Sequence, residues 1–125
     1  MDRSEAVGLI KKFVAERLPQ EDWYQVIQSE IKAVIFYGSR AKESNRPDSD
    51  IDILLIVPLS VEQAHTEGEY VFEYDGWKIN IVLRSIEKLR KLAEAGDDEF
   101  QREVFRKSEI IWESDGEVRE LLTKI

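Results

Sequence analysis

The sequence has 125 residues, of which 42% are hydrophobic and 35% are charged, a composition typical of globular rather than disordered chains. It contains no cysteine, which excludes disulfides, thiolate catalysis and cysteine-based zinc sites. The 26 acidic and 18 basic residues give a formal net charge of −8, which disfavours long nucleic acids, because their binding needs many Lys and Arg contacts to phosphate.

The N-terminal part predicts two helices. Apolar side chains recur at helical spacing over 4–18, where Ser4 is a candidate cap and Pro19 a stop, and a shorter helix follows over 21–29. No apolar run approaches the roughly 20 residues of a membrane span. The mixed charges near the N-terminus are not those of a signal peptide. Together with the absence of cysteine, this predicts a cytoplasmic protein without membrane contact.

The middle of the chain predicts strands. AVIFY (33–37) and IDILLIV (51–57) are short apolar runs of the kind found in buried strands. Both alternating faces of 51–57 are apolar, so we expect this strand to be central in its sheet. EYVFEY (69–74) and WKINIVL (77–83) flank Asp75-Gly76, the dipeptide favoured in tight hairpins.

The remaining segments complete an α+β fold. They are expected to be a loop over 58–68, a helix capped by Ser85 and ended by Gly96, a helix over 97–107, an edge strand over 109–112 and a helix over 117–124. No linker, repeat or low-complexity segment divides the chain. We therefore expect a single domain over 1–125, a small mixed β-sheet with helices packed on it.

Two aspartates stand at the start of the central strand. Asp50 and Asp52 are two residues apart, so on a strand they share a face, about 6.6 Å apart in the backbone. Two such charges repel by roughly 2–3 kcal/mol at an effective dielectric near 20. A divalent cation turns this repulsion into attraction, and carboxylate oxygens are the ligands that Mg²⁺ prefers. The alternative is a solvated turn ahead of a strand, in which PDSD is only turn chemistry.

A second feature of the sequence favours the metal site over a simple turn. Gly38-Ser39 directly follows the strand over 33–37, where glycine allows close backbone approach and Ser39 stands at an expected helix start, a place suited to phosphate. Arg40 and Arg46 add positive charge to the same segment. The pattern therefore predicts a phosphate cradle facing a metal site.

The stretch GSRAKESNRPDSDIDILLIV resembles the signature of the nucleotidyltransferase superfamily related to DNA polymerase beta, and within it the minimal nucleotidyltransferase domains of prokaryotes. The resemblance implies that Gly38 and Ser39 hold the triphosphate of a nucleotide, most often ATP, and that Asp50 and Asp52 coordinate Mg²⁺. It also implies in-line attack on the α-phosphate with pyrophosphate leaving.

One position departs from that pattern. The superfamily has a third carboxylate on a later strand, which helps to bind the catalytic metal and to activate the attacking hydroxyl, and the matching position here is Asn80. An amide brings no charge and accepts no proton from the nucleophile. Three explanations stay open: binding without efficient catalysis, substitution by another acid such as Glu73, or a strand register shifted by one residue.

The resemblance also suggests partners. Minimal nucleotidyltransferases are often paired with a small helical HEPN-type protein, and some act as antitoxins by adding AMP to it. The chain leaves little room for an acceptor-binding domain, so we expect an acceptor site from that partner or from a second copy. Two hypotheses follow: an enzyme that transfers a nucleotidyl group to a hydroxyl, or a module that neutralises its partner by contact.

Overall fold

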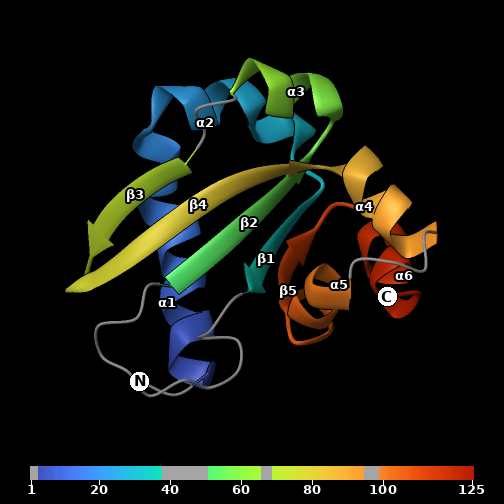
Figure 1. Ribbon diagram of the computed structural model, residues 1–125. Helices are drawn as coiled ribbons and strands as arrows, with labels where there is room; N and C mark the ends of the chain where they lie inside the picture. Colours follow the sequence, from blue (N-terminus) through green and yellow to red (C-terminus); the bar gives the residue numbers. More distant parts are fainter. Residues whose placement is uncertain (1–2, 38–50, 66–68, 95–98) are drawn as a thin grey trace.

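The computed structural model describes residues 3–37, 51–65, 69–94 and 99–125. These residues form five strands and six α-helices (Figure 1). The strands are β1 (Ala33–Tyr37), β2 (Ile51–Val57), β3 (Glu69–Tyr74), β4 (Trp77–Ser85) and β5 (Glu109–Glu113). The helices are α1 (Arg3–Glu16), α2 (Asp22–Ile27), α3 (Leu59–Ala64), α4 (Ile86–Glu94), α5 (Glu99–Arg106) and α6 (Glu117–Thr123), with short 3₁₀ turns at Leu18–Gln20 and Gln28–Glu30.

The strands form one mixed sheet in the order β3-β4-β2-β1-β5. β2 pairs with β4 in parallel and with β1 antiparallel, and the two outer pairs are antiparallel. The expected α+β class, the central place of β2 and the edge position of β5 are confirmed. β2 is central because both its faces are apolar, and each face is covered by helices.

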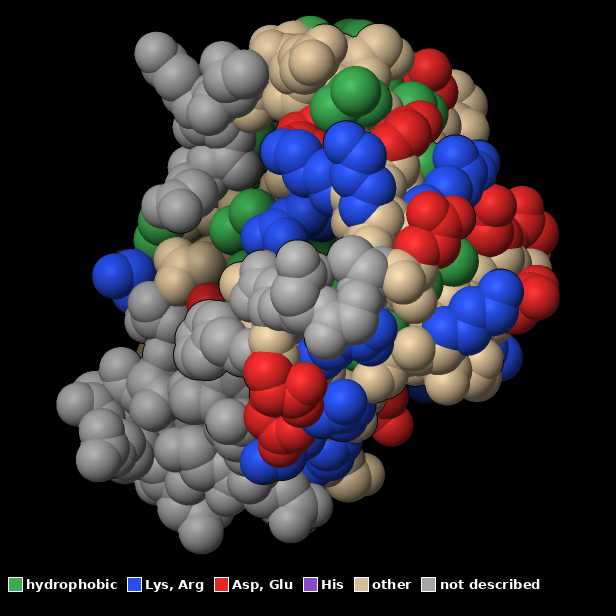
Figure 2. Space-filling model, turned by 45° about the vertical axis from the view of Figure 1, so that its right-hand side comes forward, with side chains coloured by type: hydrophobic (Ala, Val, Ile, Leu, Met, Phe, Trp, Pro, Cys, Tyr) green, Lys and Arg blue, Asp and Glu red, His purple; other side chains and the backbone are tan. Residues whose placement is uncertain are grey.

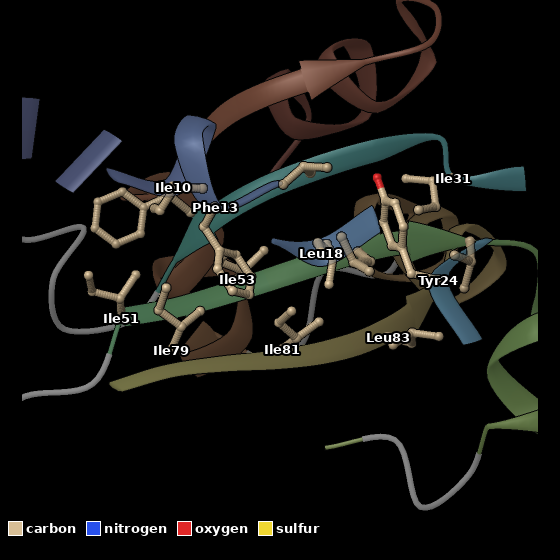
Figure 3. Close-up of a cluster of buried hydrophobic side chains, with 14 of the residues drawn as sticks. Ile10, Phe13, Leu18, Tyr24, Ile31, Ile51, Ile53, Ile79, Ile81 and Leu83 are labelled. Carbon is tan, nitrogen blue, oxygen red and sulfur yellow. The ribbon is translucent and has the colours of Figure 1, made fainter. Parts of the chain in front are cut away.

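One face of the sheet packs against α1 and α2. Ile10 and Phe13 of α1 are fully buried against alternate residues of β2 and β4, and the close-up in Figure 3 shows these side chains pointing toward one another. Aromatic rings extend the contact to β3, since the Phe13 ring centre lies 5.4 Å from that of Phe72 and 5.3 Å from that of Tyr74.

The opposite face packs against α4, α5 and α6, which lie together to the right of the sheet in Figure 1. Leu54 and Ile56 of β2 meet Leu89, Phe105 and Val118 there, all nearly fully buried. The helices cover this face over the later part of β2. Asp52, on the same face at the start of β2, is only half-buried.

The hairpin between β3 and β4 turns at the expected dipeptide. Asp75 has φ 50° and Gly76 has φ 80°, the pair of positive angles that a type I′ turn requires. The register that this turn sets places Val71 opposite Asn80 and Glu73 opposite Lys78.

Two expectations on helices were wrong. Leu59–Ala64 is the helix α3, not part of a loop over 58–68, because Pro58 begins it in extended conformation and Val61 is buried beneath it. Ser4 lies inside α1, which already includes Arg3, and so does not precede the helix as a cap. Within the described ranges, no helix is both long and apolar enough to cross a lipid bilayer.

α3 and α4 each supply a side chain that accepts a hydrogen bond from a backbone N–H at the start of the other helix. The Leu59 N–H of α3 donates to Glu87 Oε2 of α4 at 2.9 Å, and the Ser85 N–H before α4 donates to Glu62 Oε2 of α3 at 2.5 Å. Ser85 Oγ accepts from the Lys88 N–H at 3.1 Å, which confirms Ser85 as the cap of α4. Glu62 also forms an ion pair with the Lys88 ammonium. These bonds fix α3 against the end of β4.

Glu62→Gln is expected to lower the free energy of unfolding by about 1–2 kcal/mol at neutral pH, because charge-assisted hydrogen bonds become neutral ones. Burial alone would raise the pKa of Glu62, but the bonds from Lys88 and Ser85 outweigh it, and the pKa lies below the ordinary 4.5. A lowered folded-state pKa stabilises the protein above the unfolded-state pKa, and this contribution disappears as pH falls through the folded-state pKa. Urea unfolding from pH 7 to pH 3 should therefore show the difference shrinking below pH about 4.5. A difference that stays constant to pH 3 would contradict this assignment.

Candidate functional site

The candidate site lies at the start of β2, on the face that α4, α5 and α6 cover farther along. Asp52 is opposite Asn80 on the parallel strand β4 and opposite Tyr37 at the end of β1. Asn80 Nδ2 donates a hydrogen bond to Asp52 Oδ1 at 3.3 Å. Both side chains are half-buried. The carboxylate therefore stands where core gives way to solvent.

The same row of the sheet continues onto β3. Val71 lies opposite Asn80 and keeps 55% of its surface exposed, and its neighbours Glu73 and Lys78 are exposed and opposite each other. This part of the face is thus open among the described residues, and a ligand can lie on it. Sequence reasoning did not single out Val71 or Tyr37, because nothing local in the chain encodes which residues face one another across strands.

The register settles one of the three explanations for Asn80. Ile79 and Ile81 are fully buried on the α1 side of the sheet, so neither can be the residue beside Asp52. A strand shifted by one residue is therefore excluded. Asn80 occupies the place where the resemblance puts a third carboxylate.

Glu73 is a poor substitute for that carboxylate. It lies two residues along β3 from Val71 and one strand beyond Asn80, so its backbone is about 12 Å from that of Asp52. Within residues 3–37, 51–65, 69–94 and 99–125, no three His, Cys, Asp or Glu side chains gather to hold a metal ion. The other predicted site residues, Gly38, Ser39, Arg40, Arg46 and Asp50, lie outside the described residues.

The described residues fit a magnesium ion in part. Asp52, half-buried at the start of β2, offers the hard oxygen ligand that Mg²⁺ prefers. Asn80 turns its donor end toward this carboxylate, since an ionised carboxylate only accepts hydrogen bonds. The fit therefore holds for Asp52 and fails for residue 80.

The basic residues of α4 are engaged in structure. Arg90 Nη2 donates to both carboxylate oxygens of Glu117 at 2.8 and 2.9 Å, which ties α4 to α6, and Lys88 pairs with Glu62. On the side shown in Figure 2, Lys and Arg side chains lie among Asp and Glu side chains. Lys88 and Arg90 therefore belong to a charged helix surface.

His65 and Trp23 also have structural places. His65 Nδ1 lies 3.3 Å from the Tyr70 hydroxyl, and the Tyr70 ring stacks on Trp23 with ring centres 4.1 Å apart. These contacts are on the α1 side of the sheet, opposite Asp52. None of these residues therefore takes part in the candidate site.

Comparison with known families agrees with this geometry. Residues 24–117 match the family Polymerase beta, Nucleotidyltransferase, and this range includes all five strands and the candidate site. The chain belongs to the polymerase beta-like nucleotidyltransferase family. No curated protein matches the sequence significantly.

The fold of this nucleotidyltransferase-family domain also occurs in a solved structure. It is similar to a nucleotidyltransferase-like protein from Exiguobacterium sibiricum 255-15, with a TM-score of 0.53 and 11% sequence identity. The match covers 88% of this chain and 38% of that chain. At this identity the likeness concerns the fold alone, and this chain spans well under half of the larger protein.

Proposed function

We propose that this domain binds a nucleoside triphosphate, most simply ATP, together with Mg²⁺ at the start of β2. The observation that carries the proposal is the placement of Asp52 beside Asn80 on an open face of a nucleotidyltransferase-family sheet. A half-buried carboxylate at this strand start is suited to hold a nucleotide-bound cation, because carboxylate oxygens are the ligands that Mg²⁺ prefers.

The roles of the surrounding residues follow from the sequence motif. Asp50 would join Asp52 as a ligand, and the backbone of Gly38 with the hydroxyl of Ser39 would hold the triphosphate. Arg40 and Arg46 would balance phosphate charge. A cytoplasmic setting, where Mg²⁺ and ATP are plentiful, suits this proposal.

Transfer would form a bond between an acceptor hydroxyl oxygen and the α-phosphorus while the bond to pyrophosphate breaks. Bound magnesium would supply charge neutralisation at the phosphates. The acceptor proton needs a base, and the Asn80 amide cannot accept it. We therefore propose slow transfer of AMP to a hydroxyl of a protein or small molecule, with binding as the robust property.

The second candidate is a module without catalysis. In this case the domain neutralises a HEPN-type helical partner by contact, and nucleotide serves only as a structural ligand. Asn80 favours this candidate, because a general base typically contributes about 10²- to 10⁴-fold to a rate. The Gly38-Ser39 and Asp50/Asp52 motif favours the first.

Asp52→Asn is expected to weaken Mg²⁺-dependent ATP binding by about 100-fold or more. Loss of a residue that only hydrogen-bonds a metal ligand already lowers metal affinity, typically by about 10- to 100-fold. Calorimetry with ATP at fixed Mg²⁺ measures this. Asp75→Asn is the matched control: it removes the same charge at an exposed turn with positive φ, which Asn tolerates. Equal affinity in wild type and Asp52→Asn, or no ATP binding at all, would refute the proposal.

A transfer assay separates the two candidates. The domain is incubated with α-labelled ATP, Mg²⁺ and a HEPN-type helical protein, and label on either protein is counted. Label that disappears in Asp52→Asn supports the transferase. Saturable ATP binding without label supports the module, and Glu73→Gln tests whether a second acid supplies residual transfer.

A further inference from the structure

The bond between Asn80 and Asp52 has a consequence for metal stoichiometry. Asn80 Nδ2 lies 3.3 Å from Asp52 Oδ1, and because Asp52 can only accept, the NH₂ end of the amide must face it. To act as a metal ligand beside Asp52, the amide would have to rotate its oxygen inward and give up this charge-assisted bond.

The same distance shows what a carboxylate would do in this place. Two oxygen ligands on adjacent corners of an octahedral Mg²⁺, each about 2.1 Å from the metal, lie about 3.0 Å apart. The Asn80 nitrogen stands at nearly this separation from Asp52 Oδ1. A carboxylate at position 80 could therefore share a cation with Asp52. In Asn80 this position is occupied by the amide nitrogen and its hydrogens.

We propose that Asn80 makes this a one-cation site: the domain retains the cation that accompanies the triphosphate and does not bind a second one between residues 52 and 80. The inference rests on the proposed nucleotide binding and deepens it. Nucleotide would then be bound stably and transferred only slowly, because Asn80 supplies no carboxylate to accept the proton of the acceptor hydroxyl.

The charges of the described residues around the site support a single cation. Val71, directly opposite Asn80, is neutral, and Glu73 and Lys78 are opposite each other with opposite charges. The described part of the face next to Asp52 thus offers a second divalent cation no additional net negative charge. A carboxylate introduced at position 80 would add the negative charge that is missing for a second cation.

Manganese counting by electron paramagnetic resonance tests the proposal. The protein is saturated with an ATP analogue whose α–β bridging oxygen is a methylene group, so that it cannot be consumed, and Mn²⁺ is titrated. Only sites lost in Asp52→Asn are counted, which removes ions bound elsewhere on the acidic surface. Wild type should bind one Mn²⁺ per complex, and Asn80→Asp should bind two.

Val71→Asp is the matched control, because it adds the same charge on the same face one strand away, at an exposed position. It should bind one Mn²⁺. Two ions in wild type, one in Asn80→Asp, or two in Val71→Asp would overturn the inference while leaving nucleotide binding intact. Absence of bound analogue in wild type would overturn the proposed function as well.

Asn80→Ala covers the case in which Asn80→Asp fails to fold. It removes the donor without adding charge and should still bind one Mn²⁺. A second ion in this variant would mean that a second cation needs no carboxylate at position 80, and the assignment of the one-cation stoichiometry to the missing carboxylate would fail.

Discussion

Asn80→Asp is expected to raise nucleotidyl transfer by about 10²- to 10⁴-fold, the usual contribution of a positioned general base. The reason is the register of the sheet: residue 80 is directly opposite Asp52 on a parallel strand, with side chains 3.3 Å apart. A carboxylate there can both hold a cation and accept the acceptor's proton. Release of pyrophosphate from ATP measures the gain for any acceptor, including water.

The same substitution should make stability depend on magnesium. Two carboxylates about 5 Å apart repel by roughly 3 kcal/mol at an effective dielectric near 20. In EDTA the variant should unfold at a lower temperature than wild type, and Mg²⁺ with nucleotide should restore it. Val71→Asp should show neither the faster release nor a gain in stability from Mg²⁺ and nucleotide larger than that of wild type. If Asn80→Asp turns over no faster than wild type, residue 80 is not the missing catalytic position.

Phe13→Ala is expected to reduce the free energy of unfolding by about 3–5 kcal/mol, the range for removal of a buried aromatic ring. Phe13 is fully buried in α1 and joins the helix to the rings of Phe72 and Tyr74 on β3. Since whole domains are stable by about 5–15 kcal/mol, this single change takes a large part of the total. Urea denaturation with circular dichroism measures it.

Gly8→Ala in the same helix serves as the control for Phe13→Ala. Gly8 is exposed, and nothing lies within 4 Å of an added Cβ, so alanine should stabilise α1 by up to about 1 kcal/mol. Phe13 packs on the face opposite Asp52, so folded Phe13→Ala should keep its nucleotide affinity. A loss below 1 kcal/mol would mean that α1 is not part of the cooperative core.

The strands could be read from the sequence because their signals are local. The runs 33–37, 51–57 and 69–74 match β1, β2 and β3 residue for residue, and the Asp75-Gly76 turn has the expected angles. Apolar runs closed by Gly, Pro or Asp-Gly leave few alternatives for so short a segment. The helix α3 was missed because six residues give too few periods to recognise, and its first N–H is satisfied by Glu87 from a distant helix.

The same distinction between local and long-range information applies to the candidate site. By itself the sequence determined the family motif, the central place of β2 and the departure at position 80, because each depends on residue type and local order. In contrast, it is the folded sheet that makes Asn80 face Asp52 with its donor end and places the exposed Val71 opposite Asn80. Strand register comes from the packing of two hydrophobic layers and from the hairpin turn together, and no single segment of the chain contains that information.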